Sequence, residues 1–152
     1  MSAYRCVVVG TDGSESSMRA VDRAAELAGA CQARLVVALA HQPRTVDEGT
    51  AADARAALGS EAHLAFGTAP GEDAVRRAGD RARAAGARSV DTVAAVGAPV
   101  EALLDIVRRE DADLLVVGNR GLSGLRGRLL GSVPADVTRR ATVDVLVVHT
   151  TD

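Results

Sequence analysis

The stretch ADLLVVGNRGLSGLRGRLLGSVPADVTRRATVDVLVVH, residues 112–149, decides the fold because it contains a complete strand–helix–strand unit. Its first apolar run, ADLLVVG, predicts a strand buried on both faces. The segment SVPADVTRRA predicts a short helix, and VDVLVVH predicts the strand that follows it. A strand, a helix and a second strand in this order are typical of a parallel sheet.

The chain before this stretch repeats the same alternation of strands and helices. The further strand candidates are YRCVVVG (4–10), ARLVVALAH (33–41) and RSVDTVAAVG (88–97), and the further helix candidates are SESSMRAVDRAAELAGA (14–30), PGEDAVRRAGDRARAAGA (70–87) and APVEALLDIVRRED (98–111). Ser14 or Ser16 caps the first of these helices and Gly29 ends it, while Pro70 and Gly86 bound the second. This order predicts an α/β fold, an open parallel sheet with helices on both faces.

One segment, Gln42–Thr68, breaks the alternation, because it is rich in Ala, Gly and Glu and has little apolar periodicity. A connection of this length is usually a lid, a binding loop or a partly disordered segment. No domain boundary or internal repeat is apparent, so we expect residues 1–152 to form a single domain.

The composition excludes several classes of function. A formal net charge of −2 argues against nucleic acid and acidic membranes as partners. The amino-terminal sequence has no signal region and no apolar run is long enough to span a bilayer, so a cytoplasmic location is expected. Cys6 and Cys31 are expected to be reduced. The chain contains one Tyr, one Phe and no Trp, so a bound base would have to be held by aliphatic walls and backbone.

The first strand ends in VVVGTDGS, at the edge of the sheet where parallel α/β proteins bind ligands. Gly10 would let the backbone approach a ligand, and the Asp12 carboxylate could accept hydrogen bonds from ribose hydroxyls or hold a metal ion. The alternative is that Asp12 and Gly13 only form the turn into the helix, with Ser14 as its cap. The residues alone leave both interpretations open.

The glycine-rich segment after ADLLVVG predicts a phosphate site. If the last helix begins near Ser132, then Gly131 and Ser132 lie at its amino terminus, where free N–H groups and the helix dipole attract anions. Pro134 supports this start, because proline is tolerated in the first turn of a helix. Gly118 and Gly121 would let the preceding loop fold over the phosphate.

Three arginines in or near this loop, Arg120, Arg126 and Arg128, add positive potential, although each could equally be a solvated surface residue. Two other phosphate motifs are absent from the sequence. It has no G-x-x-x-x-G-K-[ST] motif, and indeed no lysine, so a P-loop NTPase is excluded. No G-x-G-x-x-G follows the first strand, which disfavours a dinucleotide oxidoreductase.

The spacing Gly118-x2-Gly121-x9-Gly131-Ser132 resembles the G-x2-G-x9-G-[ST] nucleotide motif of the universal stress protein family. The resemblance extends to VVVGTDGSESSMRAVDRAAELA near the start and to the VGAPVEALLDIV helix, and it covers the chain except for residues 42–68, which look like the family's variable region. Thr11 and Asp144 depart from the pattern, because the family more often has a hydrophobic residue or proline at the first position and proline at the second.

The resemblance implies a Rossmann-like sheet of five strands in the order 3-2-1-4-5 that binds an adenine nucleotide, either ATP or cyclic AMP. The residues implied to surround the nucleotide are Gly10, Thr11, Asp12, Ala38, Leu39, Ala40, Gly118, Arg120, Gly121, Arg128, Gly131, Ser132 and Val133. ATP would require magnesium, for which Asp12 is the candidate ligand. The Thr11 hydroxyl could alter the preference between nucleotides.

Three functions remain possible on this basis. The first is a nucleotide-binding sensor, buffer or regulator of the stress response with negligible turnover. The second is a slow magnesium-dependent ATPase that uses Asp12. The third is a dimeric protein-interaction module that needs no nucleotide, which leaves the glycine-rich loop unexplained. No Ser-His-Asp arrangement or cluster of His and Cys is apparent, so no catalytic residue is assigned.

The last strand predicts a homodimer. It is apolar, contains no proline and would lie at an edge of the sheet, where an unpaired strand invites pairing. The expected interface residues are Val143, Val145, Leu146, Val147, Val148 and His149, and the family resemblance implies the same antiparallel contact across a two-fold axis.

Overall fold

The computed structural model describes residues 2–41, 69–120 and 131–150. Its elements are β1 (Cys6–Thr11), α1 (Glu15–Cys31), β2 (Arg34–His41), α4 (Ala69–Ala84), β3 (Ser89–Val96), α5 (Pro99–Arg109), β4 (Leu114–Gly118), α6 (Ser132–Arg140) and β5 (Asp144–Val148). Every strand and helix predicted from the sequence is present. Residues 42–68, predicted to be a lid or binding loop, lie outside the described residues.

The five strands form one parallel sheet in the order β3-β2-β1-β4-β5, which confirms the predicted topology. The strand order reverses at β1, since the chain runs from β1 to β2 on one side and reaches β4 on the other side only later. Ligands of open α/β sheets bind at the carboxyl ends of the strands beside such a reversal. The topology therefore directs attention to the ends of β1 and β4.

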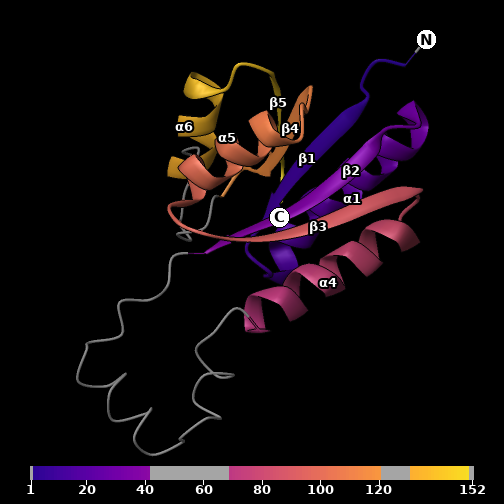
Figure 1. The fold of residues 1–152 in the computed structure, drawn as a ribbon, viewed down its shortest axis with the longest axis horizontal. Coiled ribbons are helices and arrows are strands. Elements are labelled where there is room, and N and C mark those ends of the chain that lie inside the picture. Colours follow the sequence, from indigo (N-terminus) through magenta and orange to yellow (C-terminus); the bar gives the residue numbers. More distant parts are fainter. Residues whose placement is uncertain (1, 42–68, 121–130, 151–152) are drawn as a thin grey trace, which may run out of the picture.

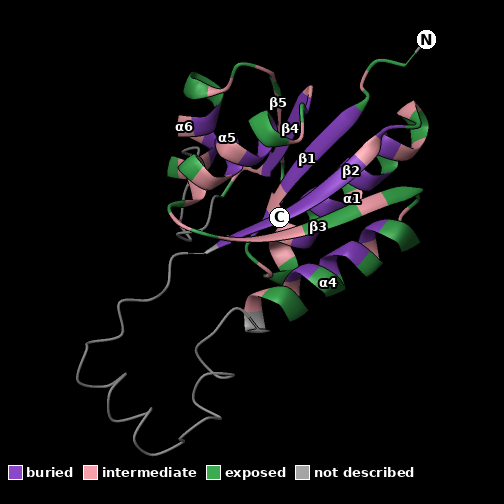
Figure 2. Cartoon of the chain, in the orientation of Figure 1, coloured by how far each residue is buried: buried purple, intermediate pink, exposed green. Residues whose placement is uncertain are grey.

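The helices form a layer on each face of the sheet, with α1 and α4 on one face and α5 and α6 on the other (Figure 1). Strands β1, β2 and β4 are buried almost throughout, while the two edge strands are more exposed (Figure 2). Because successive side chains of a strand point to opposite faces, each central strand supplies both cores. In β1, Val7 and Val9 pack beneath α1, whereas Cys6 and Val8 pack beneath α5.

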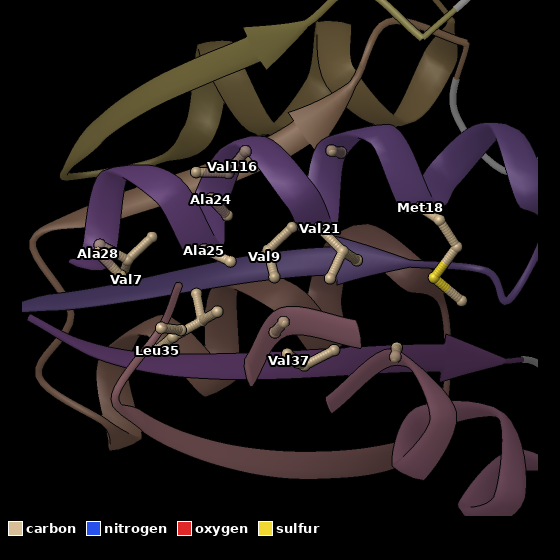
Figure 3. Close-up of a cluster of buried hydrophobic side chains, with 14 of the residues drawn as sticks. Val7, Val9, Met18, Val21, Ala24, Ala25, Ala28, Leu35, Val37 and Val116 are labelled. Carbon is tan, nitrogen blue, oxygen red and sulfur yellow. The ribbon is translucent and has the colours of Figure 1, made fainter. Parts of the chain in front are cut away.

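The core beneath α1 is built from aliphatic side chains of modest size. Figure 3 shows Val7, Val9, Leu35 and Val37 of the sheet facing a helix surface that is mostly alanine. Small helix residues let the helix backbone approach the valines of the sheet closely, so a chain with almost no aromatic residues still fills its interior. Cys6 is buried and Cys31 is half-buried, and neither forms a disulfide in the described structure.

One predicted helix end was wrong. Helix α1 continues past Gly29 to Cys31, and its cap is Gln32, which has a left-handed φ of 55°. Gly29 has a packing role instead, since a Cβ added there would lie 2.5 Å from the carbonyl oxygen of Gly86. A glycine inside a helix can therefore mark a close backbone contact as well as a helix end.

The amino ends of β1 and β4 are joined by the Asp113 carboxylate. Its Oδ1 accepts hydrogen bonds from the backbone N–H groups of Arg5 at 3.1 Å and Cys6 at 3.0 Å, and Oδ2 accepts from Arg5 at 3.0 Å. Desolvation alone would raise the pKa of Asp113, but these backbone donors and the Arg5 guanidinium outweigh it and lower the pKa.

No helix in the described part of the chain is long and apolar enough to cross a membrane.

Candidate functional site

A cleft lies at the carboxyl ends of β1 and β4, between the start of α1 and the start of α6. It encloses about 480 Å³, solvent at its mouth included, which is within the range of small-molecule sites. Its lining residues are Gly10, Thr11, Asp12, Ser14, Ser16, Ser17, Ala40, Leu103, Val117, Gly118, Arg120, Val133 and Thr150. Residues from the turn after β1, from the end of β4 and from the start of α6 therefore meet in one cleft, where α6 contributes Val133 rather than the motif residues Gly131 and Ser132.

The turn after β1 combines the two interpretations of Asp12. Gly13 has a φ of 83°, which favours glycine, and the Asp12 Oδ1 accepts a hydrogen bond from the backbone N–H of Ser14 at 2.9 Å. The Ser14 hydroxyl caps α1 by accepting from the N–H of Ser17 at 3.3 Å. Asp12 thus shapes the turn through one carboxylate oxygen while its exposed side chain lines the cleft.

The Thr11 hydroxyl is engaged by the same turn. Thr11 is only 2% exposed, and its Oγ1 lies 2.7 Å from the Ser17 hydroxyl and accepts from the N–H of Gly13 at 3.1 Å. The Ser17 hydroxyl donates to the Ser14 carbonyl at 2.8 Å, so the proton between Thr11 and Ser17 comes from Thr11. The donor capacity of Thr11 is therefore already used within the protein.

Gly10 and Gly118 both lie against side chains of the cleft walls. A Cβ added at Gly10 would lie 3.0 Å from a terminal methyl group of Leu103, and one added at Gly118 would lie 2.9 Å from the Thr150 methyl group. From the sequence, Gly10 was predicted to let the backbone approach a ligand, and Gly118 to let the preceding loop fold over the phosphate. In the structure they also let neighbouring side chains, both of which line the cleft, approach the backbone.

Helix α6 begins at Ser132 with Gly131 as its cap, as predicted. The first N–H groups of a helix have no partner within the helix. Pro134 has no N–H, and the N–H of Ala135 already donates to the Gly131 carbonyl at 3.1 Å. The helix therefore offers the backbone amides of Ser132 and Val133 at its positive end, and Val133 lines the cleft.

Asn119, which the sequence analysis did not single out, joins three segments around the cleft. Its N–H donates to the Val148 carbonyl at 2.9 Å, and its carbonyl accepts from the N–H of Gly131 at 3.0 Å. Its side-chain Oδ1 accepts from both the N–H and the hydroxyl of Thr150, each at 2.9 Å. Its position within the GNRG sequence was the only signal available, because the side chain bonds to residues far along the chain: Oδ1 to Thr150, 31 residues later, and Nδ2 to the ring of His149 at 3.5 Å.

The end of β2 forms the wall on the other side of β1. Ala38 and Leu39 are paired on both sides, with Gly10 and Thr11 of β1 and with the facing residues of β3. The pairing with β1 ends at Leu39, whereas β2 runs on to His41. Of the three β2 residues predicted to face a base, only Ala40 lines the cleft.

The other predicted site residues are three arginine and glycine positions of the loop after β4. Arg120 lines the cleft and is exposed. Gly121 and Arg128 lie outside the described residues, so their roles remain predictions. No group of three or more His, Cys, Asp and Glu side chains that could hold a metal converges within residues 2–41, 69–120 and 131–150.

Strand β5 is an edge of the sheet, as the dimer prediction requires. Val143, Val145 and Val147 pack towards the α5 and α6 face, and Leu146 and Val148 pack towards the α1 face. All five are half-buried, and His149 after the strand is exposed. In the described sheet, β5 pairs with β4 on one side, and its other backbone edge is unpaired.

Comparisons with known proteins agree on one family. Residues 3–149 match the model of the universal stress protein family. The universal stress protein Rv1636 of Mycobacterium tuberculosis is 58% identical over 153 residues, covering 99% of this chain and 100% of the relative. A crystal structure of a universal stress protein in complex with cyclic AMP is 49% identical, covers 99% of this chain and 100% of its own, and has a TM-score of 0.75.

A more distant structure, the universal stress protein UspA of Lactobacillus plantarum, is 22% identical and has a TM-score of 0.77 over 97% of this chain and 99% of its own. At that identity the likeness concerns the fold, and it supports the same sheet with helices on both faces.

Proposed function

This chain belongs to the universal stress protein family, and from that membership we propose that its cleft binds an adenine nucleotide. The observation that carries the proposal is the meeting, in one cleft, of the β1 turn and the start of α6. The cyclic AMP complex of the relative that is 49% identical over nearly the whole chain supports the same ligand class.

The phosphate is assigned to the start of α6. The amides of Ser132 and Val133 donate along the helix axis, where the dipole favours an anion. Arg120 lines the same cleft and adds a positive charge on the loop side. The phosphate thus meets two backbone donors and a guanidinium, and charge-assisted hydrogen bonds of this kind are among the stronger ones in proteins.

The nucleoside is assigned to the cleft walls formed by the ends of β1 and β2. The Asp12 carboxylate is suited to accept from ribose hydroxyls, with its Oδ1 held by the Ser14 N–H at 2.9 Å. The base lies against the end of β2 at Ala40, where β1 no longer pairs with β2. The apolar cleft residues Leu103, Val117 and Val133 provide aliphatic contacts. Selection of adenine then depends on backbone hydrogen bonds, since no aromatic side chain is among the lining residues in the described part of the chain.

Cyclic AMP is the first ligand to test. It carries a single negative charge, which the α6 amides and Arg120 can match. ATP remains the second ligand, with magnesium held between its phosphates and Asp12. We propose that the protein acts as a sensor or buffer of such a nucleotide, because the groups assigned to the cleft, the α6 amides, Arg120 and Asp12, are suited to bind a nucleotide.

The test is isothermal titration calorimetry of the purified chain with cyclic AMP, AMP, ADP and ATP, each with and without magnesium. Binding of at least one adenine nucleotide at one site per chain is expected. If all four ligands give no heat and freshly purified protein carries no nucleotide, the proposal fails. Phosphate release from ATP, with Asp12→Ala as control, separates binding from slow hydrolysis.

We also propose a homodimer through the free edge of β5. An apolar edge strand without proline is prone to pair with another strand, and a two-fold contact would satisfy both copies at once. Val147→Lys places a charge on β5, at a side chain that packs towards α5 and α6, and should give monomer or insoluble protein in sedimentation analysis. The charge substitution Val96→Lys on the opposite edge strand, where the side chain is already 57% exposed, is the control and should leave the dimer intact.

A further inference from the structure

Asn119 occupies an unusual place beside the cleft. Its neighbours in sequence, Gly118 and Arg120, both line the cleft, whereas Asn119 is not among the lining residues. Hydrogen bonds of Asn119 reach Val148, His149 and Thr150 at the end of β5, and the cap of α6. It therefore contacts groups that build the site.

The side chain of Asn119 extends the contact between β4 and β5. The paired strands end at Gly118 and Val148, and the N–H of Asn119 then donates to the Val148 carbonyl at 2.9 Å. Beyond that point the Asn119 Oδ1 accepts two hydrogen bonds from Thr150, both at 2.9 Å. Thr150 is 4% exposed and its methyl group packs against Gly118, so this anchor is buried.

The backbone of Asn119 carries that anchor to the phosphate site. Its carbonyl accepts the N–H of Gly131 at 3.0 Å, and Gly131 is the cap residue of α6. This hydrogen bond ties the Asn119 carbonyl to the residue that directly precedes the amides of Ser132 and Val133. A side chain that fixes the Asn119 peptide therefore also fixes the phosphate donors.

We infer that Asn119 is a positioning residue for the nucleotide phosphate, acting through Thr150 on one side and Gly131 on the other. The inference rests on the proposed function. It assigns Asn119 a role in affinity for the phosphate and none in affinity for the nucleoside. That difference gives the inference a test that simple destabilisation would not reproduce.

The experiment measures the affinities of cyclic AMP and adenosine for the wild type and for Asn119→Ala by isothermal titration calorimetry. The variant keeps both backbone hydrogen bonds and loses those of the side chain. We expect cyclic AMP to bind about tenfold more weakly, which is comparable to the loss of one hydrogen bond between the protein and the charged phosphate. Adenosine, which has no phosphate, should bind within about twofold of the wild type.

Two further variants complete the test. Thr150→Val removes one of the two bonds to Asn119 and should weaken cyclic AMP binding by about threefold, which preserves the test if Asn119→Ala does not fold. Thr138→Val is the matched control, because that hydroxyl lies on α6, the helix whose start carries the phosphate donors, and it donates to the carbonyls of Pro134 and Ala135 within that helix. It should leave both affinities unchanged.

An equal loss of affinity for both ligands in Asn119→Ala, or no loss for cyclic AMP, would overturn the inference. The same holds if Thr138→Val lowers cyclic AMP affinity as much as Asn119→Ala does. Failure of the wild type to bind either ligand would instead refute the proposed function itself, so the two failures are distinguishable.

Discussion

Replacing Gly118 by alanine tests the close packing that forms the cleft wall. The new methyl group would lie 2.9 Å from the Thr150 Cγ2 and 3.4 Å from its Oγ1, so one of the two must move. Thr150 cannot retreat freely, because its hydroxyl is held by Asn119 at 2.9 Å. Overpacking of this kind costs about 1–3 kcal/mol, and the lower entropy of the unfolded alanine chain offsets about 0.4–1 kcal/mol. We expect a net destabilisation of about 1 kcal/mol.

A double-mutant cycle with Thr150→Ser isolates this contact. Serine lacks the clashing methyl group but keeps the hydroxyl that donates to Asn119, so Gly118→Ala should cost little in its presence. Urea unfolding of the four proteins should give a coupling free energy of about 1 kcal/mol that favours the double variant. Gly10→Ala is the comparison, since its methyl group would meet the movable end of Leu103 at 3.0 Å and should destabilise less. Additivity within about 0.5 kcal/mol would refute the assigned role of Gly118.

Three further predictions concern the phosphate donors and the scaffold. Ser132→Pro removes one donor amide without breaking α6, because the ψ of 162° at Gly131 suits a residue before proline. Calorimetry should show that this variant binds cyclic AMP at least about tenfold more weakly. Ser132→Ala keeps the amide and should change the affinity much less. Folding lowers the pKa of Asp113, so its carboxylate stabilises the protein at neutral pH, and this contribution is lost as the pH falls below the ordinary value of 3.8. Urea unfolding across about pH 2–5 should therefore show a smaller loss of stability in Asp113→Asn than in the wild type. Arg81 forms two hydrogen bonds of 2.9 Å to Asp22 and thereby joins α4 to α1. Because this pair is partly exposed, Arg81→Lys should lower the free energy of unfolding by no more than about 1 kcal/mol. A larger loss would contradict that reasoning.

The fold could be predicted from sequence because its information is local. Runs such as VVV in β1 and LLVV in β4 have the continuous apolar character of strands buried on both faces, and serine, proline and glycine mark several helix boundaries. The exception was Gly29, where a contact with Gly86 from a distant part of the chain decided the residue type. Such a contact leaves no trace in local periodicity.

The candidate site was predictable only in part, for the same reason. Motif positions such as Gly10, Asp12 and Arg120 do line the cleft. Asn119 and Thr150 were missed because their interaction joins residues 31 positions apart, and it becomes visible only when β4 and β5 pair. The resemblance placed Ala38 and Leu39 beside the adenine base. In the structure both residues pair with β1 on one side and β3 on the other, and Ala40 is the β2 residue that lines the cleft.

The most direct test of the account is a titration of ¹⁵N-labelled protein with cyclic AMP, followed by NMR through the backbone amides. The account predicts that the amides of Ser132 and Val133 show large shifts at saturation, together with those of Asp12 and Gly118. Binding that leaves the α6 amides unmoved while others shift, or a spectrum unchanged at millimolar ligand, would contradict the assignment of the phosphate to the start of α6.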